Sequence, residues 1–183
     1  MSDKSQRPSL LPAAGQEDAE HMKDYLKRGG YTAARRVISE LHPTDVIAVV
    51  EKSGLRGLGG AGFPVARKWQ LARAGGRSPR YLVANAYDAD PAAPVARALL
   101  ERNPFAVLEG LTIAAHAIGA TDVYVYCRAD NEAANRRLRA AIAEAAVTVD
   151  VIDVGGGFPS VYPGMEPVAL EHYFETIHRA FES

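Results

Sequence analysis

Five glycines fall within nine positions at the start of the stretch GLRGLGGAGFPVARKW, residues 54–69. Glycine allows a positive φ and a close approach of the backbone to a ligand, and the freed N–H groups can hold a phosphate or a flat ring. Residues 57–62 also satisfy G-x-G-x-x-G, which indicates a dinucleotide site only between a strand and a helix. Because the preceding run TDVIAVVEKSG has helical spacing, a standard Rossmann site is disfavoured. The stretch is either a cofactor cradle or a ligand-free connection.

The other residues that could do chemistry point to structural roles when each is taken alone. Cys127 is the only cysteine, which excludes an internal disulfide and a cluster or zinc site held by several thiolates of this chain. We expect it to be an inert core residue, and Trp69 to be a packing anchor. Asp88 and Asp90, read alone, are loop carboxylates that cap a helix or turn. Structural or surface roles, rather than metal ligation, are expected for His21, His42, His116, His172 and His178.

Composition limits the possible classes of protein. The 183 residues are 48% hydrophobic and 23% charged, which suits one compact core, and the formal net charge of -1 indicates neither nucleic acid nor an anionic membrane as a partner. No apolar run approaches the roughly 20 residues of a spanning helix, and the polar start lacks the apolar segment of a signal peptide. With a single cysteine, these features predict a soluble, cytoplasmic protein without a membrane span.

The hydrophobic periodicity, together with the glycines and prolines that end helices and strands, predicts an α/β architecture. Residues 1–20 mix Pro, Ser, Gln and charges without period and are expected to form a disordered tail, with a single domain over 21–183. Residues 22–53 predict a short helix, a Gly29-Gly30 break and two further helices, the last with Thr44 as its N-cap. Strands are predicted at 80–85, 122–127 and 147–154, helices at 94–103, 105–118, 131–146 and 166–183, and a second glycine-rich loop at 155–164. This alternation predicts parallel strand pairs with right-handed crossovers.

Several motifs in order resemble one family. The segments SGLRGLGGAGFPVARKW, RYLVANAYDADPAAPVAR and NPFAVLEG, with the upstream run YLKRGGYTAARRVISELHPTDVIAVVEKSGLRG, are similar to the flavoprotein subunit of NADH:quinone oxidoreductase (respiratory complex I), which binds FMN and NADH. Related subunits occur in NAD-dependent formate dehydrogenases and hydrogenases. The resemblance covers residues 25 to about 145. It implies a Rossmann-like FMN-binding domain, a parallel sheet flanked by helices, in which a glycine loop and an acidic loop cradle flavin and nicotinamide.

The resemblance also implies which side chains contact the cofactors. Phe63 would stack against the nicotinamide nucleotide, Lys68 would reach the FMN, and the outer carboxylate of the acidic loop, Asp90, would contact NADH. The flavin itself carries the hydride chemistry, so no catalytic side chain is assigned. The complete implied set of cofactor-binding residues is Gly57, Gly59, Gly60, Gly62, Phe63, Lys68, Asn85, Asp88, Asp90, Tyr162 and Glu166.

This sequence departs from the family pattern at three places near the implied site. Leu58 stands where the family has an arginine, Val65-Ala66 replace Thr-Gly, and Tyr87 replaces an aspartate. The ubiquitin-like domain and the four-cysteine iron–sulfur module are absent from the sequence, so we expect no iron–sulfur cluster in this chain.

Two functions of different class stay open. One is an FMN-binding, NADH-oxidising electron-transfer flavoprotein, or a subunit of a larger NADH dehydrogenase-type complex. Its electrons would pass to another redox subunit or acceptor protein, or the chain would form a homo-oligomer. The other is a degenerate, non-catalytic subunit or interaction module with a decayed cofactor pocket. A nucleotide-binding regulator is a third option.

Overall fold

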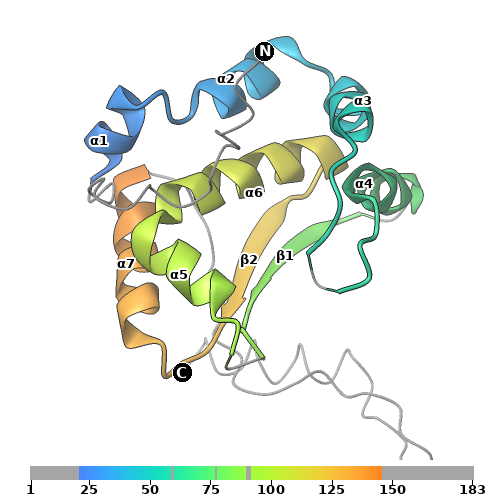
Figure 1. The fold of residues 1–183 in the computed structure, drawn as a ribbon. Coiled ribbons are helices and arrows are strands. Elements are labelled where there is room, and N and C mark those ends of the chain that lie inside the picture. The colour runs from blue at the N-terminus through green and yellow to red at the C-terminus, as the bar shows by residue number, and fades with distance from the viewer. Residues whose placement is uncertain (1–20, 59, 77, 90–91, 146–183) are drawn as a thin grey trace, which may run out of the picture.

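The computed structural model describes residues 21–58, 60–76, 78–89 and 92–145. The expected tail, the third strand, the second glycine-rich loop and the final helix all lie outside these residues. Figure 1 shows the described elements, which in chain order are α1 (Met22–Lys27), α2 (Thr32–Glu40), α3 (Pro43–Ser53), α4 (Val65–Ala74), β1 (Tyr81–Ala86), α5 (Val95–Arg102), α6 (Pro104–Ile118), β2 (Asp122–Cys127) and α7 (Glu132–Ala145).

The two strands form a parallel pair. Their register runs from Tyr81 opposite Asp122 to Ala86 opposite Cys127, and α5 and α6 make the crossover between them. Side chains alternate across the sheet, so Val125 and Cys127 are buried on the face that α6 covers. This arrangement confirms the predicted α/β class with a parallel sheet flanked by helices.

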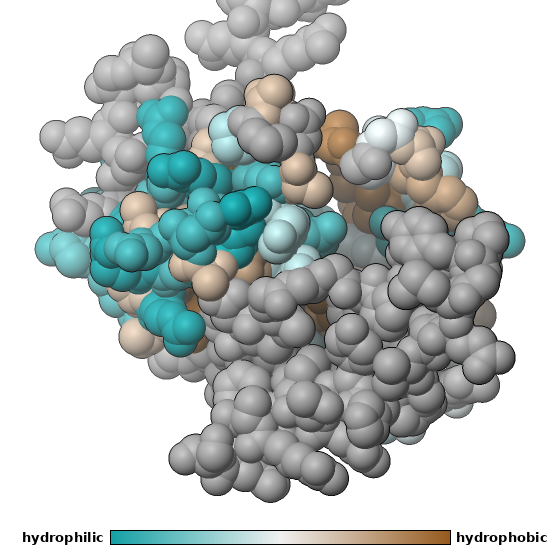
Figure 2. Space-filling view, turned by 90° about the horizontal axis from the view of Figure 1, so that it is seen from below, coloured by the Kyte–Doolittle hydropathy of each residue, from teal (hydrophilic) through white to brown (hydrophobic). Residues whose placement is uncertain are grey.

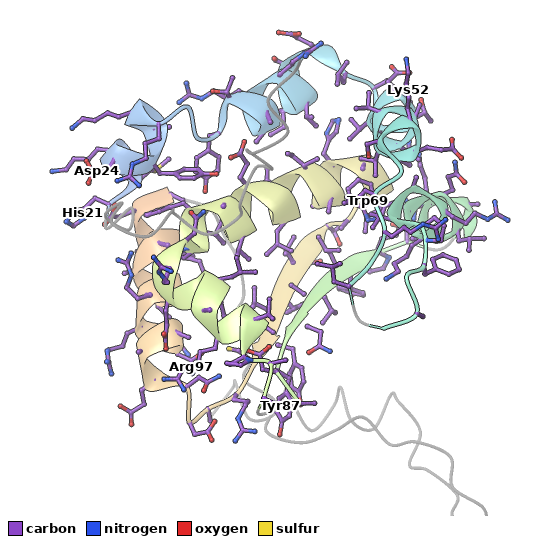
Figure 3. The ribbon with its side chains drawn as sticks, viewed as in Figure 1. His21, Asp24, Lys52, Trp69, Tyr87 and Arg97 are labelled. Atoms are coloured by element: carbon purple, nitrogen blue, oxygen red, sulfur yellow. The ribbon has the colours of Figure 1, made fainter. Side chains whose placement is uncertain are left out.

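Helix α6 is the centre of the fold, and α2, α3, α4, α5 and α7 all pack against it (Figure 1). It begins after Asn103 with Pro104 in its first turn and ends at Gly119, whose φ of 71° is left-handed, as the sequence predicts. Its residues Phe105 and Leu108 join the main core. A second core cluster joins residues of α2, α3, α4 and α6, and Trp69 of α4 packs against it, as its apolar area predicts (Figure 3).

The structure differs from the sequence predictions at two helix starts. The N-cap of α3 is His42 rather than Thr44, because Pro43 takes the first helical position and the His42 ring accepts from the Thr44 backbone N–H at 3.4 Å. The second correction is α4, which the sequence pattern did not predict. Its N-cap is Pro64, which has no side-chain acceptor, so the residue pattern carries no polar start signal there.

The entry helices are held by carboxylates from distant helices. Glu109 of α6 accepts from the Tyr31 N–H at 2.9 Å, the Ala34 N–H at 3.1 Å and the Tyr25 hydroxyl at 2.6 Å, and so caps α2. Burial and this hydrogen bond to Glu109 raise the pKa of Tyr25. Glu144 of α7 caps α1 in the same way, accepting from the Met22 N–H at 2.7 Å. The first two helices are therefore fixed to the core by charge-assisted hydrogen bonds.

Candidate functional site

The glycine run forms a loop that is closed at its base. Arg56 and Pro64 make an antiparallel bridge, the Gly57 N–H donates to the Phe63 carbonyl at 2.9 Å, and the Val65 N–H donates to the Leu55 carbonyl at 3.0 Å. These contacts pin the two ends of residues 57–63 together between α3 and α4. The sequence predicted the loop, and its preceding element is a helix, as the spacing indicated.

Two of the predicted cradle glycines are required by backbone conformation. Gly60 has a φ of 104° and Gly62 a φ of 58°, and no heavy atom lies within 4 Å of a Cβ built on either. Packing therefore does not exclude a side chain here, but a positive φ does. The Gly62 carbonyl is held by the Arg56 guanidinium at 2.9 Å. A Cβ built on Gly57 would lie 3.6 Å from the Phe63 carbonyl oxygen, an ordinary van der Waals contact. Gly59 lies outside the described residues.

The loop leads directly into the amino end of α4. The N-cap residue Pro64 offers no side-chain acceptor, and the Val65 N–H is already bonded to the Leu55 carbonyl. The positive end of the helix dipole lies next to the loop. Lys68 lies exposed in the second turn. Phe63 is 43% exposed and Leu58 is 92% exposed, so both present apolar surface to solvent. Backbone N–H groups, a cation and an aromatic ring thus lie along one short segment.

The acidic loop begins where β1 ends. Asn85 is exposed in the strand, and its side-chain oxygen accepts from the Tyr87 N–H at 3.1 Å. Asp88 has a φ of 50°, and its two carboxylate oxygens accept from the N–H groups of Ala96 at 3.0 Å and Arg97 at 2.6 Å. Asp88 therefore caps α5, the role that its residue type alone predicted. Asp90 lies outside the described residues, as do Tyr162 and Glu166.

An aromatic stack anchors the same loop, and the sequence pattern did not reveal its partners. The Tyr87 ring lies parallel to the Tyr126 ring with 5.2 Å between the centroids, and the Arg128 guanidinium lies 5.4 Å from the Tyr87 centroid. Asp130 holds that guanidinium at 2.8 Å, which lowers the pKa of the aspartate and raises that of the arginine. The feature that could have revealed these partners is the parallel pairing of β1 with β2, which sets Asn85 opposite Tyr126 at the strand ends.

The structure brings the two predicted cofactor loops to one side of the fold. In Figure 1 the glycine loop descends beside β1 toward the side where the carboxyl ends of β1 and β2 lie. Tyr87 lies at those strand ends in Figure 3. Figure 2 views the molecule from this side and shows hydrophilic surface on one flank and hydrophobic surface on the other. Carboxyl ends of parallel strands are where α/β folds bind ligands.

Other singled-out residues that the structure describes have structural partners, whereas His172 and His178 lie outside the described residues. The His116 ring lies 3.1 Å from the Leu41 carbonyl, and the His21 ring lies 2.8 Å from Glu144. Cys127 is buried, and its thiol lies 2.8 Å from the Asn135 side-chain oxygen. Within the described residues no three His, Cys, Asp or Glu side chains gather as metal ligands. Among the helices described, none is long and apolar enough to cross a bilayer.

Comparison with known families and proteins gives matches that agree with one another. A family model described as the Nuo51 FMN-binding domain matches residues 50–166. An NADH-quinone oxidoreductase subunit of Rhizobium meliloti (strain 1021) is 40% identical over 138 residues, covering 75% of this chain and 33% of the relative. NADP-reducing hydrogenase subunit HndC of Solidesulfovibrio fructosivorans is 41% identical over 128 residues, covering 70% of this chain and 26% of the relative.

The structural likeness points the same way. A solved NAD+-reducing NiFe hydrogenase in the air-oxidized state superposes with a TM-score of 0.59 at 29% identity, covering 73% of this chain and 24% of the hydrogenase chain. This chain thus spans a third or less of the length of these relatives.

Proposed function

The chain belongs to the family of the Nuo51 FMN-binding domain, and from that premise we propose that it binds FMN through its glycine loop and works in an NADH-oxidising redox complex. The observation that carries the proposal is the loop itself. Gly60 and Gly62 hold positive φ in open space, and the loop enters a helix whose amino end has no side-chain cap. A backbone that is bare, fixed at its base and followed by an uncapped helix suits an anionic, planar cofactor.

The residues present fit that cofactor. The N–H groups of the loop and the amino end of α4 would hold negative charge, and Lys68 would add a cation from the second turn of the same helix. The half-exposed ring of Phe63 would provide a face for the nicotinamide nucleotide. When bound, FMN supplies the chemistry, since it accepts a hydride and can release the electrons one at a time.

The acidic loop would contribute through position and charge. Asn85 is exposed at the end of β1 and would offer an amide to the flavin. Asp88 uses both carboxylate oxygens to cap α5, so we assign it the role of a positioning residue that shapes the loop. The direct contact with NADH is then proposed for Asp90, and further cofactor contacts are proposed for Tyr162 and Glu166.

The electrons must leave to a partner in this proposal. Relatives of this chain are named as subunits of quinone-reducing and hydrogenase enzymes, so another redox subunit in the cytoplasm is the proposed acceptor. A homo-oligomer of this chain that passes its electrons to such an acceptor is also consistent with this proposal. The chain's one cysteine supports the expectation that the iron–sulfur centre belongs to that partner.

A non-catalytic role is the second candidate. It is favoured by Leu58, which leaves an apolar side chain 92% exposed where the family has an arginine, and by Tyr87, which is packed into a stack where the family has an aspartate. In this alternative the fold serves as an interaction module and its flavin is never reduced.

Anaerobic reduction separates the two functions. NADH is added to the flavin-loaded chain, alone and with any co-purifying subunit, and the flavin absorbance is followed. The proposed function predicts bleaching in the wild type. Phe63→Ala should weaken NADH binding with flavin retained, since the lost stacking costs about 0.5–1.5 kcal/mol in addition to the cost of the lost buried area. Lys68→Met should instead lower flavin retention or its ease of reduction. Bound flavin that NADH never bleaches would leave the interaction module as the function.

A further inference from the structure

Two half-buried guanidinium groups meet at the end of the molecule opposite the cofactor loops. Arg73 lies in the last turn of α4 and Arg80 directly precedes β1. Both approach the carboxyl end of α6, since the Nη1 atoms of Arg80 and Arg73 lie 3.4 Å and 3.7 Å from a Cβ built on Gly119. Figure 1 shows that α4, the amino ends of both strands and the end of α6 converge there.

The fold draws the two arginines together through helix ends. Arg73 donates to the Ala117 carbonyl of α6 at 3.3 Å, and Arg80 donates to the Arg73 carbonyl of α4 at 3.1 Å. Each guanidinium therefore caps the negative end of a helix. A Cβ on Gly119 would lie in ordinary van der Waals contact with both arginine heads, and the left-handed φ of 71° is what favours glycine at this C-cap.

These caps leave most of the donors without an acceptor. A guanidinium carries five N–H donors, and one hydrogen bond is formed by each of these two among the residues that the structure describes. The Nε atom of Arg80 is buried and has no partner there. No carboxylate within the same residues forms an ion pair with either arginine. The nearby Asp122 bonds Thr121 at 2.6 Å instead.

We propose that Arg73 and Arg80 form an oxyanion-binding site. Two like charges this close repel each other, and an anion between them removes that repulsion while accepting the unused N–H groups. The fork of each guanidinium fits the two oxygens of a carboxylate or phosphate. The ligand class is therefore a carboxylate or phosphate oxyanion, supplied either as a small molecule or as an acidic side chain of a neighbouring subunit.

The position of the site gives it a means to influence the cofactor loops. Arg73 ends the helix that carries Lys68 at its start, and Arg80 begins the strand that carries Asn85 at its end. An anion held by both arginines would clamp α4 to β1. The site does not overlap the proposed flavin site, because it lies at the opposite end of these two elements.

The test is the thermal stability of the full chain with inorganic phosphate, with acetate, or with chloride at equal ionic strength. Phosphate, acetate or both should raise the Tm of the wild type more than chloride does. Arg73→Gln and Arg80→Gln should abolish this excess rise in Tm. Titration calorimetry should show that each variant binds the anion at least about tenfold more weakly, because one charge-assisted hydrogen bond is lost. Arg73→Lys keeps the charge without the fork and should bind at intermediate strength.

Two control variants make the outcome specific. Arg136 is an exposed arginine of α7 paired with Glu132, so Arg136→Gln should keep the full response. Lys68→Met separates this site from the cofactor loop. A phosphate effect that arose at the cofactor loop would be lost in that variant, whereas an effect at Arg73 and Arg80 would persist. A response to phosphate alone identifies a phosphate-bearing small molecule, and a response to acetate as well admits an acidic side chain. Equal effects of all three salts, or a response retained in both glutamine variants, would overturn the site.

Discussion

The ring of Tyr87 is stacked on the ring of Tyr126, with their centroids 5.2 Å apart and their planes 7° from parallel. Tyr87 belongs to the loop after β1 and Tyr126 to β2, so the stack joins the acidic loop to the second strand. Arg128 lies against the same ring. Together with the Asp88 cap on α5, this stack gives the acidic loop a defined shape without a ligand.

Removing the Tyr87 ring should loosen that loop. Tyr87→Ala loses the aromatic pair, which contributes about 0.5–1.5 kcal/mol beyond the buried area, and the cation–π contact with Arg128. Tyr87→Phe retains both contacts and serves as the control. Urea denaturation of the two variants measures the difference. Equal stability of the Ala and Phe variants would show that the stack contributes nothing to the fold.

The carboxylate of Glu109 should be the most sensitive polar position among the entry helices. Glu109→Gln keeps the shape but replaces one acceptor oxygen by an NH₂ group, which then faces either the Ala34 N–H, now at Oε1, or the donors of Tyr25 and Tyr31, now at Oε2. We expect a loss of about 1–3 kcal/mol in the free energy of unfolding. Glu132→Gln removes an exposed pair with Arg136 and should change it by less than about 0.5 kcal/mol. Similar losses in the two variants would contradict the capping role.

Substitution by alanine should change the stability of the fold in opposite directions at two glycines. A Cβ on Gly30 would overlap the ring of Tyr25, which is packed against Phe105, so Gly30→Ala should destabilise by about 1–3 kcal/mol. Gly110 lies in the interior of α6 with open space around its Cβ position, so Gly110→Ala should stabilise by about 0.5–1 kcal/mol. Thermal unfolding of both variants checks the signs. A stabilised Gly30→Ala would show that the Tyr25 ring is not seated there.

The cap on α1 should be lost in acid. The pKa of Glu144 lies below its usual value of 4.5 because the Met22 N–H and the His21 ring bond its carboxylate. The contribution of a lowered pKa is complete above the unfolded value and disappears as pH falls through the folded value. The stability difference between wild type and Glu144→Gln should therefore be full at about pH 6 and shrink below about pH 4.5. Thermal unfolding across about pH 3–7 measures it, and a constant difference would exclude this origin.

Local patterns were enough to predict the elements that frame the site. The alternating β-branched and aromatic residues of β2, and the Pro104 start and Gly119 end of α6, are signals carried by adjacent residues. The glycine loop was visible for the same reason, since a positive φ at Gly60 and Gly62 selects the residue type directly.

What could not be predicted depends on partners that are distant in sequence. Tyr31 is capped by Glu109, 78 residues away, and nothing around either residue indicates the other. The partners of Tyr87 follow only from the register of β1 on β2. Helix α4 was missed because Pro64 offers no polar cap, the feature that makes its amino end suited to an anion. At the candidate site, the absence of a local start signal is thus part of the proposed chemistry.

Flavin content of the reconstituted chain tests the central proposal most directly. Wild type, Gly62→Val and Gly75→Ala are incubated with FMN, freed of unbound flavin by gel filtration, and measured by absorbance, with circular dichroism to verify the fold. Gly62 holds a φ of 58° in the loop, whereas Gly75 ends α4 at a φ of -64° with only ordinary contacts. We predict stoichiometric FMN in wild type and Gly75→Ala, and flavin lost from a folded Gly62→Val. A folded wild-type chain that retains no FMN, or a Gly62→Val chain that retains as much as wild type, would contradict the glycine loop as the flavin cradle.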